Sequence, residues 1–254
     1  MLDIVVPVYN EGEGILRLFD EIQREIRSEK RVLVVYDFEG DTTVPAVRGR
    51  AGSYPFEVSL VLNTLGRGAL NAIKTGMQAA TAEMVLVMMA DSSDRLDVVD
   101  SMCALMSQGY DIVCGSRYMK GGRQNGGPFL KGLFSRTAGL SLHFLTGIPT
   151  HDVTNSFKLY RKSLLEKIDI ESSGGFELGL EICVKAYAMG YKISEVPSEW
   201  FDREEGKSNF HMWKWLPHYL HWYFWCIRRT WFGKRLPFCS DGKNFYEVKY
   251  EFDK

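Results

Sequence analysis

The chain has 254 residues, of which 45% are hydrophobic and 25% are charged, and its formal net charge is −1. This length fits one α/β domain with a large core and a small appendage, and the balanced charge does not indicate a nucleic acid partner. Five scattered cysteines without CxxC spacing, and a first segment without a basic start, indicate buried thiols in the cytoplasm rather than a secreted protein.

The hydrophobic pattern predicts strands and helices that alternate along the chain. The predicted strands are residues 4–8, 31–36, 57–62, 83–89, 111–114, 154–160 and 192–197. The predicted helices are residues 15–26, 67–80, 96–106, 129–147 and 176–189. Most strands are nearly continuous apolar runs, which favours a mostly parallel sheet covered by helices on both faces. Residues 119–128 hold four glycines and predict a mobile loop, and residues 199–210 are polar.

The C-terminal segment differs from the rest of the chain in composition. Residues 210–240 contain no Asp or Glu, and they hold five of the six tryptophans, interleaved with lysine and arginine. Aromatic and basic side chains favour the membrane–water boundary, but no run of eighteen apolar residues is present to span a bilayer. We expect residues 211–254 to form an amphipathic helical tail on a membrane surface; the alternative is a helix packed on the domain or on a second subunit, as in a homo-oligomer.

Polar side chains follow three of the predicted strands at the point where each strand ends. Tyr9, Asn10 and Glu11 follow the first strand, Asp37 closes the second, and Asp91 follows residues 83–89. The carboxyl ends of parallel strands form the edge at which open α/β sheets bind ligands. A carboxylate there is suited to holding Mg²⁺ or Mn²⁺ against a diphosphate, because these ions bind one or two carboxylates together with phosphate oxygens.

These residues also have structural interpretations. Asp91 and the serines after it are common helix caps, and residues 41–43 are typical of a turn. Asp37 is placed either to close its strand or to bind a base or a ribose. Residues 63–69 resemble a phosphate loop, but Asn71 stands where GxGxxG requires its third glycine, which disfavours a dinucleotide-dependent dehydrogenase.

Basic and acidic side chains elsewhere complete the candidate chemistry. Arg117 follows a strand, and Arg203 and Lys207 flank a glycine; such residues bind phosphate, although each alone is more often a solvated charge. The adjacent His151 and Asp152 suggest acid–base chemistry. Residues 177 and 181 are glutamates one helical turn apart, usually a solvated pair, which in a cleft would bind a metal or act as a base.

Taken together, these segments resemble the family 2 glycosyltransferases of the GT-A fold, and more narrowly the dolichyl- and polyprenyl-phosphate sugar transferases. The resemblance covers about residues 3–210 and depends on the order and spacing of several segments. They are VVPVYNE (5–11), VVYDFEGDTT (34–43), NTLGRGALNAIKTG (63–76), MADSSD (89–94), GSRY (115–118), HDVTNSFKLYRKSLL (151–165) and EVPSEWFDREEGKSNF (195–210). The resemblance implies a Rossmann-like GT-A domain over residues 1–210, followed by the tail at 211–254.

The resemblance also implies roles for individual residues. Those expected to bind the donor nucleotide are Pro7, Tyr9, Glu11, Asp37, Ala90, Asp91 and Lys207. Those expected to act in catalysis are Asp91, Arg117, Asp152 and Arg203, with Gly206 and Ser208 completing the last phosphate-binding motif. The expected cofactor is Mg²⁺ or Mn²⁺, held by Asp91 and Ser93.

The chain departs from the family pattern at a few positions. Met89 stands where the metal motif has its first Asp, and Asp94 is placed to supply the missing charge. In the second-strand motif, Tyr36 replaces the first Asp and Phe38 replaces Gly. Asn209 replaces the Lys that often ends the last motif.

The expected function is inverting transfer of a sugar from a nucleotide-diphosphate donor to a membrane lipid, foremost a polyprenyl phosphate. A phosphate acceptor needs little activation because it is largely dianionic at neutral pH, whereas a hydroxyl acceptor would need a base such as Asp152 or Glu177. The expected location is cytoplasmic, peripheral on the inner face of the cell membrane. The alternatives are transfer to a hydroxyl of a glycan or another lipid, a non-catalytic module that binds a sugar nucleotide, and a nucleotidyltransferase.

Overall fold

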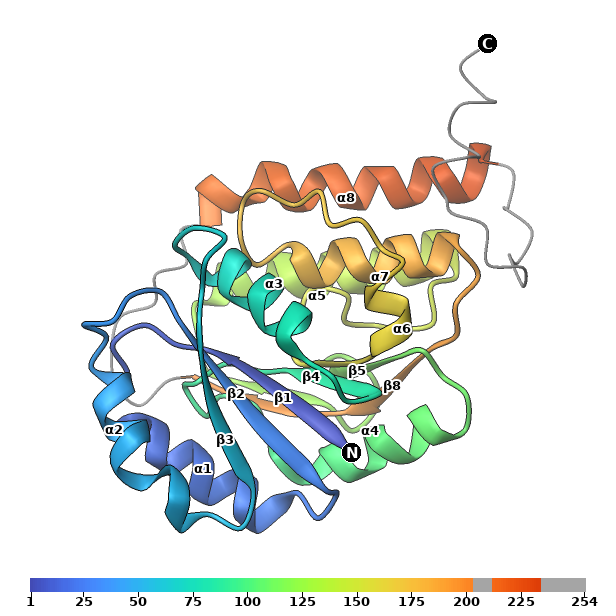
Figure 1. Ribbon diagram of the computed structural model, residues 1–254. Helices are drawn as coiled ribbons and strands as arrows, with labels where there is room; N and C mark the ends of the chain where they lie inside the picture. Colours follow the sequence, from blue (N-terminus) through green and yellow to red (C-terminus); the bar gives the residue numbers. More distant parts are fainter. Residues whose placement is uncertain (203–211, 234–254) are drawn as a thin grey trace.

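The structure, a computed structural model, describes residues 1–202 and 212–233 (Figure 1). Seven strands form the main sheet: β1 (Leu2–Pro7), β2 (Lys30–Tyr36), β3 (Glu57–Leu62), β4 (Met84–Val87), β5 (Ile112–Ser116), β7 (Lys158–Arg161) and β8 (Ile193–Pro197). The helices are α1 (Gly14–Glu25), α2 (Thr43–Arg50), α3 (Ala69–Ala79), α4 (Val99–Ser107), α5 (Phe129–Thr146), α6 (Lys162–Leu165), α7 (Leu178–Ala188) and α8 (Met212–Phe232). Two short 3₁₀ turns, Ala51–Ser53 and Leu96–Val98, complete these elements.

The order of the strands places the ends of β1, β2 and β4 side by side. The sheet runs β3-β2-β1-β4-β7-β5-β8, and β1 pairs in parallel with both β2 and β4. Only β7 is antiparallel to its neighbours β4 and β5. The expected mostly parallel α/β sheet is therefore confirmed, and the residues that follow β1, β2 and β4 meet at one edge of it.

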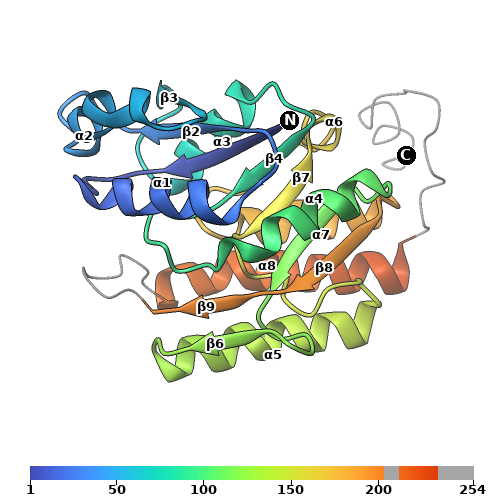
Figure 2. The same ribbon diagram turned by 90° about the horizontal axis from the view of Figure 1, so that it is seen from below.

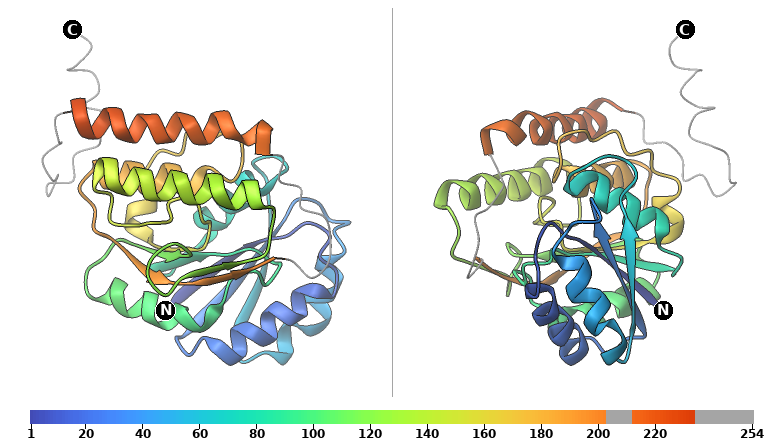
Figure 3. Two further views of the ribbon diagram at one scale, coloured as in Figure 1. Left: turned by 180° about the vertical axis from the view of Figure 1, so that it is seen from behind. Right: turned by 60° about the vertical axis from the view of Figure 1, so that its left-hand side comes forward.

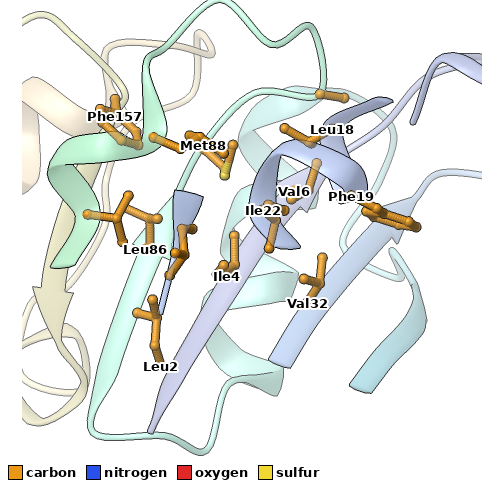
Figure 4. Close-up of a cluster of buried hydrophobic side chains, with 14 of the residues drawn as sticks. Leu2, Ile4, Val6, Leu18, Phe19, Ile22, Val32, Leu86, Met88 and Phe157 are labelled. Atoms are coloured by element: carbon orange, nitrogen blue, oxygen red, sulfur yellow. The ribbon is translucent and has the colours of Figure 1, made fainter. Parts of the chain in front are cut away.

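Two apolar cores hold the sheet between its helices. Alternate residues of β1 point to opposite faces, so that Leu2, Ile4 and Val6 belong to the core that contains Phe19 and Ile22 of α1 (Figure 4). This core also takes side chains from α2 and α4, whereas α3, α7 and α8 contribute to the core on the other face (Figure 2). On that second face, Gly76 leaves room for Val5, since a β-carbon at residue 76 would overlap its side chain.

The predicted elements match most of the observed ones, with corrections where no strong pattern exists. Within the predicted loop 119–128, residues 123–125 form the strand β6 (Arg123–Asn125), which pairs with β9 (Glu199–Phe201) in the polar segment. The predicted strand 154–160 begins only at Lys158, because side-chain oxygens bind the backbone N–H groups of Asn155 and Phe157. Helix α2 was not predicted, because a proline and a glycine interrupt its pattern.

Helix α8 lies within the expected tail, and it packs beside α5 and α7 (Figures 1 and 3). Trp222 and Cys226 are buried against the core, and the indole nitrogen of Trp231 donates to the carbonyl of Leu145 at 2.8 Å. One face of this helix is thus part of the domain, while Phe224 and Trp231 remain exposed on the other. No helix in the described ranges is both long and apolar enough to cross a membrane.

Candidate active site

One edge of the sheet collects the polar residues predicted to follow the strands. Pro7 ends β1, and Tyr9 and Glu11 lie in the turn that leads to α1. Asp37 follows β2, and Asp91 follows β4, which are the two strands paired with β1. Because these strands are parallel, the structure brings the five predicted residues to the same edge of the sheet.

The turn after β1 is clamped to the segment that follows β2. Asn10 has a left-handed backbone with φ of 56°, and its N–H donates to Oδ2 of the buried Asp41 at 3.0 Å. The side-chain oxygen of Asn10 accepts from the N–H of Thr42 at 3.2 Å, and the N–H of Glu11 donates to Oγ1 of Thr43 at 3.0 Å. Residues 41–43 therefore form the predicted turn, and they also fix the turn that carries Tyr9 and Glu11.

Asp37 holds the loop between β3 and α3. Its Oδ1 accepts from Nδ2 of Asn63 at 2.7 Å, and its Oδ2 accepts from the N–H of Gly68 at 2.8 Å. Asn63 continues the network by accepting from the hydroxyl of Thr75 at 2.9 Å. A carboxylate has about four lone-pair positions, so Asp37 keeps acceptor capacity for a ligand while it fixes this loop.

The segment after β4 presents a carboxylate beside a buried hydroxyl. Asp91 accepts the N–H of Ser93 at 3.2 Å, and Ser92 between them adopts a left-handed backbone with φ of 51°. The hydroxyl of Ser93 is buried and has no hydrogen-bond partner within the described part of the chain. Because buried polar atoms normally have partners, this pair fits a bound divalent ion or phosphate oxygen.

Asp94 follows this pair in the chain, and it is buried. Burial raises its pKa to about 7, with the nearby Arg117 opposing the shift and the Asp91 carboxylate adding to it. Its Oδ1 accepts a long hydrogen bond of 3.4 Å from Nδ2 of Asn155. At neutral pH, Asp94 therefore holds its proton part of the time, and a cation bound nearby would favour its charged form. The described residues contain no cluster of three or more acidic, histidine or cysteine side chains arranged for a metal.

Arg117 and Asp152 form a buried ion pair at the end of β5. The guanidinium Nε lies 2.6 Å from Oδ2 of Asp152, and Nη2 lies 2.9 Å from Oδ1. Nη2 also donates to the hydroxyls of Ser135 and Thr154, at 2.9 and 3.2 Å. Burial alone would raise the pKa of Asp152, but the neighbouring Arg117 lowers it below its usual value. Asp152 is therefore an anion that orients Arg117.

The other acid–base candidates are engaged in structural contacts. His151 points away from Asp152: its Nδ1 lies 2.5 Å from Oε1 of Glu195, and its ring stacks on another histidine. Glu177 and Glu181 are fully buried, and they accept four backbone N–H groups from residues 171–175 at 2.6–2.8 Å. These two glutamates therefore hold the loop before α7 rather than face solvent.

Some predicted site residues lie outside the described part of the chain, and the sequence did not indicate one residue that supports the site. Arg203, Lys207 and the neighbouring Gly206 and Ser208 lie outside the described residues. Asn63 was not singled out from the sequence, although its side chain links the loop to Asp37. Nothing in the local pattern around an isolated asparagine indicates a contact to a carboxylate 26 positions earlier.

The fold and this strand-edge site define a glycosyltransferase of the GT-A type. The profile described as Glycosyl transferase family 2 matches residues 3–169, and the chain belongs to that family. Its relatives include polyprenol monophosphomannose synthase of Mycolicibacterium smegmatis, with 28% identity over 81% of this chain and 79% of the relative. The dolichol-phosphate mannosyltransferase of Pyrococcus furiosus is also 28% identical, over 82% of this chain but only 58% of its own length.

Solved structures support the same fold. The mannosyltransferase PcManGT of Pyrobaculum calidifontis, in complex with GDP-Man and Mn²⁺, superposes with a TM-score of 0.64 at 23% identity, over 94% of this chain and 66% of that one. Glucosyl-3-phosphoglycerate synthase of Mycobacterium tuberculosis, in complex with Mg²⁺ and UDP, has a TM-score of 0.61 at 15% identity, over 91% and 79%. At these identities, the likeness shows the GT-A fold, and the expected fold class is confirmed.

Proposed function

We propose that this glycosyltransferase transfers mannose from GDP-mannose to a polyprenyl phosphate, with inversion at the anomeric carbon. The two curated relatives, whose names describe mannosyl transfer to polyprenol or dolichol phosphate, support the sugar and the acceptor. The complex of PcManGT with GDP-Man supports the donor. In the reaction, an acceptor phosphate oxygen attacks the anomeric carbon as its bond to the diphosphate breaks, and GDP leaves.

The observation that carries the proposal is the Asp91–Ser93 pair at the carboxyl end of β4. Its carboxylate and its buried hydroxyl without a described partner are the oxygen donors that Mg²⁺ and Mn²⁺ prefer. These residues would hold the ion, and when bound it would neutralise the charge that develops on the leaving diphosphate. Pro7, Tyr9, Glu11 and Asp37 of the same edge would bind the nucleoside.

Among the described residues, Arg117 is a largely buried cation that would assist departure of the diphosphate. Its ion pair with Asp152 fixes the plane of the guanidinium, and its side chain keeps 10% exposure. Asp94 behind it adds a second, titratable carboxylate. Preorganised charge of this kind stabilises the transition state because it needs no rearrangement during the reaction.

The burial of the carboxylates favours a phosphate over a hydroxyl as acceptor. Asp152 and Glu177, the two candidates for a base, are both fully buried and hydrogen-bonded, Asp152 to Arg117 and Glu177 to its own loop. A phosphate monoester, with a second pKa of about 6, is already largely dianionic at neutral pH and needs no base.

We also propose that α5 and α8 form the membrane-facing surface. Exposed aromatic side chains lie on both helices, which pack against each other: Phe129, Phe134, Phe144, Phe224, Trp231 and Phe232. Arg136 and Arg228 are exposed on the same two helices. Aromatic rings at the interface with nearby basic groups suit an anionic bilayer, and they would bring the protein to the cytoplasmic face where a lipid acceptor lies.

The activity is tested with the full chain, radiolabelled GDP-mannose, Mn²⁺ and vesicles that contain polyprenyl phosphate. We expect label in the organic phase, and we expect Asp91→Asn to lower the rate by about a hundredfold or more. Asp97→Asn, which removes a half-exposed carboxylate nearby in the chain, is the matched control and should retain the rate. Absence of lipid-linked product with both GDP- and UDP-sugars would overturn the proposal, as would full activity of Asp91→Asn.

The membrane surface is tested by sedimentation with anionic vesicles. Deleting the tail is unsuitable, because Trp222 and Cys226 of α8 belong to the core. The double variant Phe144→Glu and Phe232→Glu instead changes side chains that are 87% and 80% exposed. It should remain in the supernatant, whereas Arg50→Glu, an exposed residue at the end of α2, should sediment like the wild type. Equal sedimentation of the double variant would refute this surface.

A further inference from the structure

An aromatic side chain that the family pattern lacks lies beside the residues expected to bind the nucleoside. Phe38 occupies the position at which the related motif has glycine, and it directly follows Asp37 at the end of β2. Its ring meets the ring of Tyr9 edge-on, with 5.9 Å between centroids and 64° between planes. The Arg67 guanidinium carbon lies 5.3 Å from the centroid of the same ring.

The backbone of the loop that carries Arg67 is held by hydrogen bonds. Arg67 lies between Gly66 and Gly68, whose φ angles of 106° and 113° are ones that residues with a β-carbon rarely adopt. Asp37 accepts the N–H of Gly68, and Asn63, which binds Asp37, also donates to the carbonyl of Gly66 at 2.6 Å. Asp37, which precedes Phe38, thus holds the loop that carries Arg67.

The three side chains present a surface suited to a planar heterocycle. Tyr9 is 58% exposed, Phe38 is partly exposed and Arg67 is exposed, so all three side chains are accessible to a ligand. Aromatic rings stack on bases of any kind, and a guanidinium adds cation–π attraction and hydrogen-bond donors for ring carbonyls. The surface adjoins Asp37, which directly precedes Phe38 and binds the loop that carries Arg67.

We propose that Phe38 is a base-stacking residue of this chain, which binds the nucleobase of the donor against its ring beside Tyr9 and Arg67. The inference extends the proposed function, because it assumes that the crevice binds a nucleoside diphosphate. It assigns to Phe38 the affinity for the base, and it leaves the diphosphate to Asp91, Ser93 and Arg117.

The opposite role is a plug, in which Phe38 fills the base position and must move aside. The two roles predict opposite signs, since truncation of a stacking residue weakens nucleotide binding and truncation of a plug strengthens it. Removing a stacking aromatic costs about five- to a hundredfold in affinity for one base.

The test is calorimetric titration of the full chain with GDP and, separately, with inorganic pyrophosphate, both with Mn²⁺. We expect Phe38→Ala to raise the Kd for GDP by about five- to a hundredfold and to leave the Kd for pyrophosphate unchanged, because pyrophosphate has no base. Phe38→Tyr keeps the ring and should bind GDP within about twofold of the wild type. Arg50→Ala, which truncates an exposed side chain at the end of α2, is the control and should bind GDP like the wild type.

Each outcome decides between the alternatives. An unchanged or lower Kd for GDP with Phe38→Ala overturns the inference, as does an equal loss of GDP and pyrophosphate. If pyrophosphate binds too weakly to measure, the inference is overturned when Phe38→Tyr loses as much affinity for GDP as Phe38→Ala does. If the wild type binds neither GDP nor UDP, the proposed function and this inference fall together. If the wild type binds GDP and the Phe38 variants bind it equally well, the inference falls and the proposed function stands.

Discussion

Replacing Asp152 by asparagine should destabilise the protein strongly, because it leaves the Arg117 guanidinium buried without its counter-charge. Asp152 is 0% exposed, its partner is 10% exposed, and their two closest N–O distances are 2.6 and 2.9 Å. Breaking a buried pair of this kind by removing one partner costs about 3–5 kcal/mol. For a domain of this size, that corresponds to a fall in Tm of about 6–20 °C.

The loss should depend on pH in a defined direction. The pKa of Asp152 in the folded protein is below its usual value of 3.8, so the folded state binds fewer protons than the unfolded state near that pH. Its contribution is therefore present above about pH 4 and is lost as the pH falls through the folded pKa. The difference in stability between wild type and Asp152→Asn should be present at neutral pH and should close only below about pH 4.

The assay is urea unfolding followed by circular dichroism, with Asp97→Asn as the matched control. Asp97 forms a surface pair with Arg95 at 3.6 Å, and both side chains are about half exposed, so its loss should cost no more than about 1 kcal/mol. Equal unfolding midpoints for Asp152→Asn and Asp97→Asn would refute the assignment of Asp152 as the residue that orients Arg117.

Three further predictions concern other buried carboxylates. Burial holds the pKa of Asp94 at about 7, above its usual value of 3.8. As the pH rises from 4 to 7, the wild type should therefore lose stability relative to Asp94→Asn, as measured by urea unfolding without metal. Asp41→Ala should release the turn after β1 and raise the Kd for GDP with Mn²⁺ in calorimetry, since Asp41 accepts the Asn10 N–H. Glu177→Gln should lower the free energy of unfolding by about 1–3 kcal/mol, because one backbone N–H would then face an amide NH₂, while kcat should not change.

The sequence predicted the sheet well because its central strands are buried on both faces. Runs such as residues 2–7 and 30–36 have apolar residues on either face of the sheet, and only a central parallel strand needs both. The short strands β6 and β9 could not be predicted in this way. They pair with each other at the margin of the fold, and their six residues carry no apolar periodicity.

The sequence predicted where the candidate site lies, but not the hydrogen bonds and ion pairs of its side chains. Strand ends locate Asp37 and Asp91 because parallel topology alone brings those ends together. The partners of the side chains depend on contacts between distant segments, such as Arg117 with Asp152 across 35 positions and His151 with Glu195 across 44. For this reason, an adjacent His-Asp pair in the sequence became two separate contacts in the structure.

Two departures from the family pattern place an aromatic or apolar side chain against a core. Tyr36, in place of the first Asp of its motif, is 5% exposed and belongs to the core beside α1, whereas the next residue, Asp37, lies after the end of β2. Met89, at the corresponding place in the metal motif, packs against the core on the other face. Two carboxylates in tandem repel each other and raise the cost of burying the first. An aromatic side chain at residue 36 and an apolar one at residue 89 therefore avoid the cost of burying a carboxylate, while Asp37 and Asp91 remain at the edge of the sheet.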